Sequence, residues 1–124
     1  MDKQELQERM TTLAVRIINM VDALPSTLGA QAIARQVVRS GTSPSANYRA
    51  ACIAKSDKDF LNKLKMVEEE LDETCHWLDL IMRCQMLKPA RIEPLYQECK
   101  ELLSITVKSI VTLRARLNAN EMAK

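Results

Sequence analysis

The sequence predicts an all-α protein, a four-helix bundle whose neighbouring helices run antiparallel in an up-down-up-down order. The 124 residues contain only two glycines and four prolines, fewer than strands and hairpin turns require. Apolar residues recur every three or four positions along most of the chain, which is the period of a helix buried on one face. The breaks between these segments are short, so consecutive helices must be antiparallel. We expect one domain spanning residues 1–124.

Each expected helix has recognisable ends. The first ends before Pro25, because a residue that precedes a proline avoids the helical conformation. Ser26 or Thr27 can cap the second helix, and Ser56 can cap the third through a side-chain oxygen. Pro89 suits the first position of the fourth helix, where its missing N–H is not needed. The predicted helices cover residues of about 2–24, 27–54, 57–87 and 89–118.

The second helix contains the one cluster of helix-breaking residues inside the chain, between Gly41 and Pro44. Gly41 can adopt the left-handed conformation that closes a helix. Ser43 can then cap a new turn that begins at Pro44. We therefore predict that this helix is kinked or interrupted for one turn near Gly41–Pro44.

Charge is divided unevenly along the chain. Residues 1–55 carry seven basic and four acidic side chains, a net +3; residues 56–87 carry four and eight, a net −4; residues 88–124 again have a net +3. No acidic residue lies between Ala23 and Lys55. Three interpretations are open: basic and acidic helices pack side by side in one bundle, they meet across a subunit interface, or the basic helices face nucleic acid.

The third predicted helix has more apolar circumference than a single bundle needs. Met66, Trp77 and Leu80 form a second apolar flank beside the main stripe, and Glu70 and Glu73 lie on the same flank. An apolar surface that also bears carboxylates is typical of an oligomer interface. Tryptophan buries a large area and keeps a polar N–H, so Trp77 is the expected anchor.

The two carboxylates on this flank need partners. Arg35 and Arg39 lie on the side of the second helix opposite its apolar stripe. Arginine is the best partner for a partly buried carboxylate, so we predict that Arg35 or Arg39 pairs with Glu70 or Glu73, within or between chains. The predicted interface and ion-pair residues are Arg35, Arg39, Glu70, Glu73 and Trp77.

The sequence predicts no catalytic site, metal site or cofactor. Glu73 and His76 have the carboxylate–histidine spacing of di-iron bundles, but such a site needs two of these motifs, and the chain has one histidine. A catalytic triad or a structural zinc site would have to share that residue. We expect an exposed His76, four reduced and mostly packed cysteines, and no enzymatic activity.

Localisation follows from hydropathy. No apolar stretch approaches the roughly 18 residues that a membrane span needs, and the polar start of the chain is unlike a secretion signal. We expect a cytoplasmic protein without a membrane partner.

The stretch from Ser40 to Ile81 resembles a bacterial family. The residues that carry the resemblance are Ser40-Gly41-Thr42-Ser43, Ala46-Asn47-Tyr48-Arg49-x-Ala51, Ser56-x-x-Asp59-Phe60, Lys63-Leu64-Lys65, Glu70, Glu73-Thr74 and Trp77-Leu78. They are similar to the "four helix bundle protein" family, also called intervening-sequence or S23-like proteins. Some members are encoded within intervening sequences of large-subunit ribosomal RNA genes. The family is also related to the accessory variability determinant proteins of diversity-generating retroelements.

This resemblance implies a four-helix bundle that assembles into a ring, commonly a homopentamer, with no established enzymatic role. For the retroelement relatives it implies binding to nucleic acid and to a reverse transcriptase. We therefore expect a non-catalytic, self-assembling helical scaffold. The alternative is a nucleic-acid-binding accessory protein that acts with a reverse transcriptase or ribosomal RNA through its second and fourth helices. The basic residues considered for that role are Arg35, Arg39, Arg49, Lys100, Lys108, Arg114 and Arg116.

Four positions depart from the family pattern. Ala50 stands where family members often carry Glu, and Glu69 stands where they often carry Lys. The first change leaves the segment around Arg49 more basic. The second makes the third helix more acidic, which argues against nucleic acid contacting that helix. Pro44-Ser45 replaces Ile-Gly at the predicted break.

Overall fold

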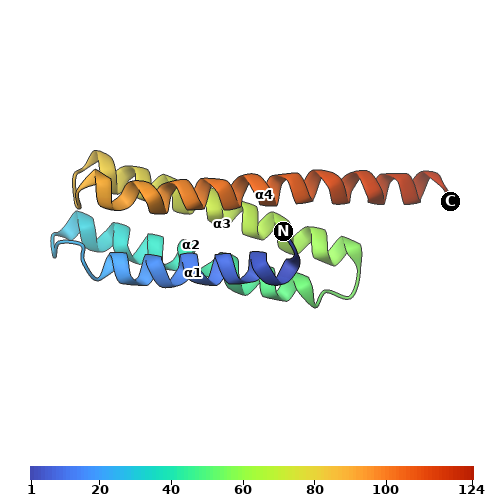
Figure 1. Ribbon diagram of the computed structural model, residues 1–124, viewed down its shortest axis with the longest axis horizontal. Helices are drawn as coiled ribbons and strands as arrows, with labels where there is room; N and C mark the ends of the chain where they lie inside the picture. Colours follow the sequence, from blue (N-terminus) through green and yellow to red (C-terminus); the bar gives the residue numbers. More distant parts are fainter.

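The computed structural model describes all residues, 1–124, as four helices without strands. They are α1 (Lys3–Val21), α2 (Leu28–Cys52), α3 (Asp57–Arg83) and α4 (Pro89–Met122). Figure 1 shows the α1–α2 and α3–α4 turns at one end of the molecule and the α2–α3 turn at the other. Neighbouring helices are therefore antiparallel, and the predicted four-helix bundle is confirmed.

The helices begin where capping chemistry predicts. Thr27 caps α2 and Ser56 caps α3, each accepting a hydrogen bond from the backbone N–H three residues on, at 3.3 and 3.1 Å. Asp2 caps α1 in the same way at 2.8 Å. Pro89 occupies the first turn of α4. These contacts satisfy backbone donors that have no partner inside the helix.

The predicted interruption of the second helix is wrong, because α2 continues through Gly41 and Pro44. A Cβ atom on Gly41 would lie 2.8 Å from Cγ1 and 2.9 Å from Cγ2 of Ile17 on α1. Gly41 therefore permits the close approach of α1 and α2, and its φ is not positive. Ser43 does not cap a new turn; its hydroxyl accepts a hydrogen bond from the Asn47 side chain at 2.8 Å.

Three helix ends differ from the sequence prediction by about one turn. α1 and α3 each end about one turn earlier than their apolar patterns suggest. Leu24, Met86 and Leu87 still pack against the core, but they do so from the turns. An apolar side chain can pack against the core from a tight turn as well as from a helix. The apolar periodicity of the sequence therefore continues past the last helical residue. α4 instead extends to Met122, about one turn beyond its predicted end.

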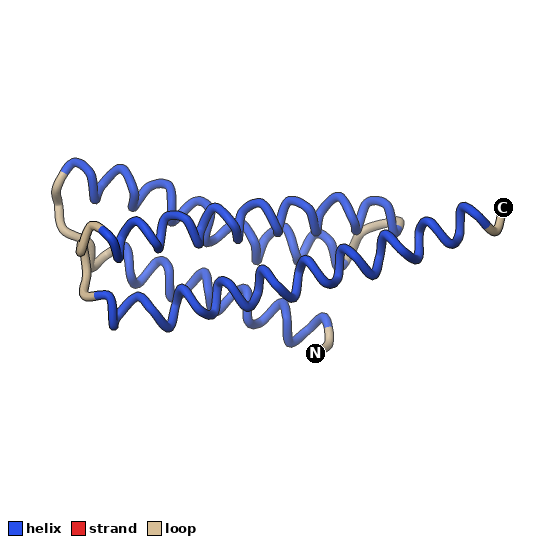
Figure 2. Tube along the Cα trace, turned by 90° about the horizontal axis from the view of Figure 1, so that it is seen from above, coloured by secondary structure: helices blue, strands red, loops and turns tan.

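The core is one continuous cluster along the bundle axis, and α3 packs against both α2 and α4. α1 packs mainly against α2 and contacts α4 far less. The last buried residue of α4 is Leu113, so the end of this helix extends beyond the other three (Figure 2). The largest side chains that are fully enclosed include Met10, Leu13, Ile17, Leu64, Leu71, Leu78, Ile81, Ile92 and Leu102.

Candidate interaction surface

The predicted ion pair forms between α2 and α3 of one chain. Nη1 of Arg39 lies 2.9 Å from Oε2 of Glu70, and Nη2 of Arg39 contacts Oε2 of Glu73. The hydrogen bond to Glu70 raises the pKa of Arg39 above its ordinary value. The Arg39 side chain is 49% exposed and that of Glu70 is 24% exposed, so solvent screens the attraction and the network stabilises the fold only modestly.

Trp77 is joined to the same carboxylate. Its indole N–H donates a hydrogen bond to Oε2 of Glu73 at 3.1 Å. One oxygen of Glu73 thus holds both Arg39 and Trp77. The ring is partly buried against the core, and Met66, about three turns earlier on α3, is 44% exposed. We call Arg39, Glu70, Glu73, Trp77 and Met66 the Trp77 face.

A buried pair of hydroxyls lies beneath the Trp77 face. Oγ of Ser40 on α2 and Oγ1 of Thr74 on α3 are hydrogen-bonded at 2.9 Å, and both residues are fully buried. Thr74 also donates to the backbone carbonyl of Glu70 at 2.7 Å. Sequence reasoning missed this contact, although each residue occupies a core-facing position of its helix. The pair fixes how α2 and α3 lie against each other where Arg39 crosses between them.

The remaining predicted residues are spread along the molecule. Arg35 is exposed and forms no ion pair, so Arg39 alone provides the predicted pairing. Arg49, Lys100 and Arg114 are also exposed. Lys100 lies with its ammonium 5.4 Å from the centre of the Tyr96 ring. His76 is exposed, as predicted, with its ring 4.9 Å from that of Trp77.

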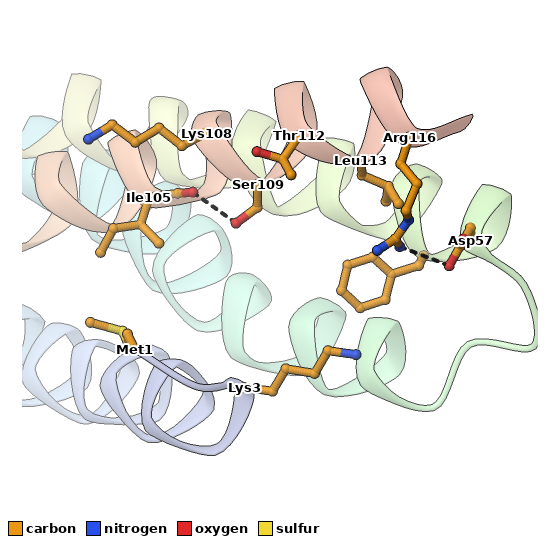
Figure 3. Close-up of a pocket in the computed structure, with 10 residues that line it drawn as sticks. Met1, Lys3, Asp57, Ile105, Lys108, Ser109, Thr112, Leu113 and Arg116 are labelled. Carbon is orange, nitrogen blue, oxygen red and sulfur yellow. Dashed lines mark hydrogen bonds and ion pairs between the residues drawn. The ribbon is translucent and has the colours of Figure 1, made fainter. Parts of the chain in front are cut away.

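Two of the predicted basic residues, Lys108 and Arg116, line one open hollow of about 490 Å³ (Figure 3). The hollow lies between the start of α1, the start of α3 and the second half of α4. Lys3 joins them from α1, and its ammonium is 4.6 Å from the centre of the Phe60 ring. Arg116 also pairs with Asp57 at 3.2 Å. We call this site, with its three cations, the basic hollow. Sequence reasoning missed Lys3 because it is remote from Lys108 along the chain.

A second ion-paired cluster joins α1 to α4. Arg9 donates to both carboxylate oxygens of Glu98, at 3.1 and 2.5 Å, and lies 3.3 Å from Glu101. The hydrogen bond to Glu98 raises the pKa of Arg9. Nothing in the sequence pattern distinguished these residues from other exposed charges. The cluster ties α1 to α4, which contact each other least among the neighbouring helices of the bundle.

The structure contains no group of three His, Cys, Asp or Glu side chains that could hold a metal ion. Cys99 is buried and donates its thiol hydrogen to the carbonyl of Leu71 at 3.4 Å. Its hydrogen bond with Cys75 and its burial raise the pKa of Cys99, so this thiol is a poor nucleophile. Cys84 is exposed. No helix combines the length and apolar character that crossing a bilayer requires.

Fold and surface together define a small four-helix-bundle protein in which ion pairs join α2 to α3, α1 to α4 and α3 to α4. Comparison with known proteins identifies the family within this class of four-helix bundles. A family model described as "23S rRNA-intervening sequence protein" matches residues 2–108, and the chain belongs to this family. The resemblance noted in the sequence is thereby confirmed, and the family description states no reaction.

A solved structure shares the fold. It is a protein of unknown function from the S23 ribosomal protein family of Bacteroides thetaiotaomicron VPI-5482. The two chains are 31% identical and superpose with a TM-score of 0.79, covering 85% of this chain and 97% of the other. None of the curated proteins compared with the chain is a significant match.

Proposed function

We propose that this protein is a non-catalytic, self-assembling helical scaffold that forms a ring-shaped homo-oligomer in the cytoplasm. One observation carries the proposal: the chain covers Trp77 only in part, while Glu73 holds its N–H in place. A partly exposed tryptophan is the residue type that most often anchors a protein interface. Met66 extends the apolar area of the same face.

The network around Trp77 favours association for an entropic reason. Arg39 and Trp77 both bind Glu73, so the indole is restrained before any partner arrives. A restrained side chain loses less conformational freedom on binding, and more of the energy from apolar burial then appears as affinity. Family resemblance suggests five subunits, and a ring forms when two different surfaces of each copy meet head to tail.

Light scattering at micromolar concentration tests this proposal. We expect a molar mass several times 14.1 kDa, and five times that value for a pentamer. A monomer would contradict the proposal. The variant Met66→Glu places a charge on the Trp77 face and should lower the mass. Val15→Glu is its matched control, because Val15 is 52% exposed on α1, away from this face, and should leave the mass unchanged.

A second candidate function is binding to structured nucleic acid. What supports it is a set of exposed basic residues that form no ion pair in the chain: Arg35, Arg49, Lys100, Lys108 and Arg114. A ring would add their charges over several subunits, which strengthens attraction to phosphates. Binding to a structured ribosomal RNA fragment should then be detectable at about 50 mM salt and weaken steeply as salt increases. No binding at low salt would exclude this role.

A further inference from the structure

We propose that the basic hollow of one copy binds an acidic surface on α3 of a second copy. This acidic surface consists of Glu68, Glu69 and Asp72, and we call it the acidic ridge. The inference rests on the proposed self-assembly and identifies a charged contact that the copies make in addition to the contact of the Trp77 face. The contact is heterologous, because the hollow and the ridge are different parts of the chain.

The basic hollow has positive charge that its own chain does not neutralise. Lys3 and Lys108 form no ion pair, and only Arg116 has a carboxylate partner, Asp57 at 3.2 Å. Lys3 and Arg116 reach into the hollow from opposite walls, one from α1 and the other from α4 (Figure 3). Ile105 adds an apolar surface at the end of the hollow away from Arg116 (Figure 3). The site therefore suits an acidic surface with apolar side chains beside its carboxylates.

The acidic ridge has this composition. Glu68, Glu69 and Asp72 line a shallow groove together with Leu103 and Val107 of α4, and Val107 is an exposed apolar residue. None of the three carboxylates forms an ion pair within the chain. The adjacent Glu70 and Glu73 differ, since both are paired with Arg39. The ridge is thus a part of α3 whose carboxylates form no ion pair within the chain.

The two surfaces cannot meet within one molecule. Leu103 and Ile105 are two residues apart on α4 and so point about 160° away from each other. Leu103 lines the groove of the ridge, and Ile105 lines the hollow. α4 therefore separates the surfaces, and their charges can be matched only between copies. Repeating such a contact produces either a closed ring or a filament.

Charge and apolar area have different roles in this contact. The opposed charges orient the approaching copies and speed their encounter, an effect that salt weakens. Burial of the exposed Val107 beside the apolar lining of the hollow supplies affinity that salt does not screen. Raising the ionic strength should therefore weaken the assembly without abolishing it.

Charge reversal on the full chain tests the pairing. The hollow variant is Lys3→Glu with Lys108→Glu, and the ridge variant is Glu68→Lys with Glu69→Lys. Each should raise the dissociation constant of self-association by about tenfold or more, because like charges then face each other. Combining all four changes in one chain should restore the affinity to within about threefold of the unmodified protein.

The matched control is Lys88→Glu with Arg91→Glu. It makes the same change in charge on exposed residues at the opposite end of α4 and should leave the dissociation constant unchanged. Circular dichroism checks that each variant remains helical. If the unmodified protein assembles and neither reversal weakens it, or if the combined variant fails to recover, the pairing of hollow and ridge is wrong while the scaffold function stands.

Two further outcomes separate the proposals. A monomeric unmodified protein would overturn the scaffold function and this inference with it. If the hollow variant loses affinity for RNA but assembles normally, the hollow is a nucleic-acid site and the pairing is again wrong. Loss of assembly in both reversal variants, with recovery in the combined chain, is the result we expect.

Discussion

The indole N–H of Trp77 donates a hydrogen bond of 3.1 Å to Glu73, which lies one turn earlier on α3. The same carboxylate oxygen contacts the guanidinium of Arg39 from α2. A side chain on one helix is thereby restrained by a charge on another. This arrangement links the packing of α2 against α3 to the position of the residue we expect to anchor assembly.

Replacing Arg39 should weaken this link. Arg39→Met keeps much of the side-chain stem but removes both ion pairs, so we expect the free energy of unfolding to fall by about 1 kcal/mol. The indole of Trp77 should also become more mobile, because Glu73 is no longer held. Urea unfolding measures the first effect, and tryptophan fluorescence anisotropy measures the second.

Arg83→Met is the control for this experiment. Arg83 pairs only with Asp79, within α3, and its side chain is largely exposed. Its replacement should change the free energy of unfolding by less than about 0.5 kcal/mol and leave Trp77 unaffected. Equal effects of the two substitutions would show that the Arg39 network has no special role.

Gly41 and Gly29 should respond in opposite ways to alanine. At Gly41 the added Cβ meets the branched Cγ atoms of fully buried Ile17, which cannot turn aside, so Gly41→Ala should destabilise the fold by about 1–3 kcal/mol. Gly29 has no atom within 4 Å of its would-be Cβ. Gly29→Ala should therefore stabilise the helix by about 0.5–1 kcal/mol. Thermal unfolding of both variants compares them directly, and a Gly41→Ala protein as stable as the parent would refute the close-packing role.

Tyr48 should make the fold sensitive to alkali. Burial raises the pKa of the Tyr48 phenol, whereas the unfolded chain releases this proton near pH 10. The contribution of Tyr48 is therefore complete below about pH 10 and is lost as pH rises further, by about 1.4 kcal/mol per pH unit. Urea unfolding from about pH 8 to pH 11 measures this loss.

Comparison of two tyrosine variants isolates the effect. Tyr48→Phe should unfold with a shallower dependence on alkaline pH than the parent protein, because the ionising group is gone. Tyr96→Phe should retain the steep dependence, since Tyr96 is less buried than Tyr48. A parallel dependence in all three proteins would mean that Tyr48 does not govern alkaline unfolding.

The interaction surface could be predicted from the sequence only in part. Helical periodicity placed Glu70, Glu73 and Trp77 on one flank of α3, and the need to compensate two carboxylates pointed to Arg35 or Arg39. Whether Arg35 or Arg39 meets these carboxylates depends on the axial offset of α2 relative to α3. The buried hydrogen bond between Ser40 and Thr74 helps to set this offset. Periodicity describes each helix separately and contains no information about this offset.

Proximity across helices explains what the sequence did not reveal. Lys3 and Lys108 line one hollow, and Arg9 pairs with Glu98. In each case one residue belongs to the first helix and the other to the last, so the two are far apart along the chain. Exposed lysines and arginines are common on any helix, so their spacing along the chain gives no sign of partners. Such clusters become visible only when the crossing of α1 and α4 is known.

By itself, the sequence determined the number of helices, their capped starts and the apolar stripes that form the core, because these depend on residues close together in the chain. The tertiary structure alone decided that α2 continues through Gly41, because the glycine is needed where Ile17 of another helix approaches. It also decided which charges are neutralised and which remain free. Local preferences act over one or two helical turns, whereas contacts between helices depend on how all four pack together.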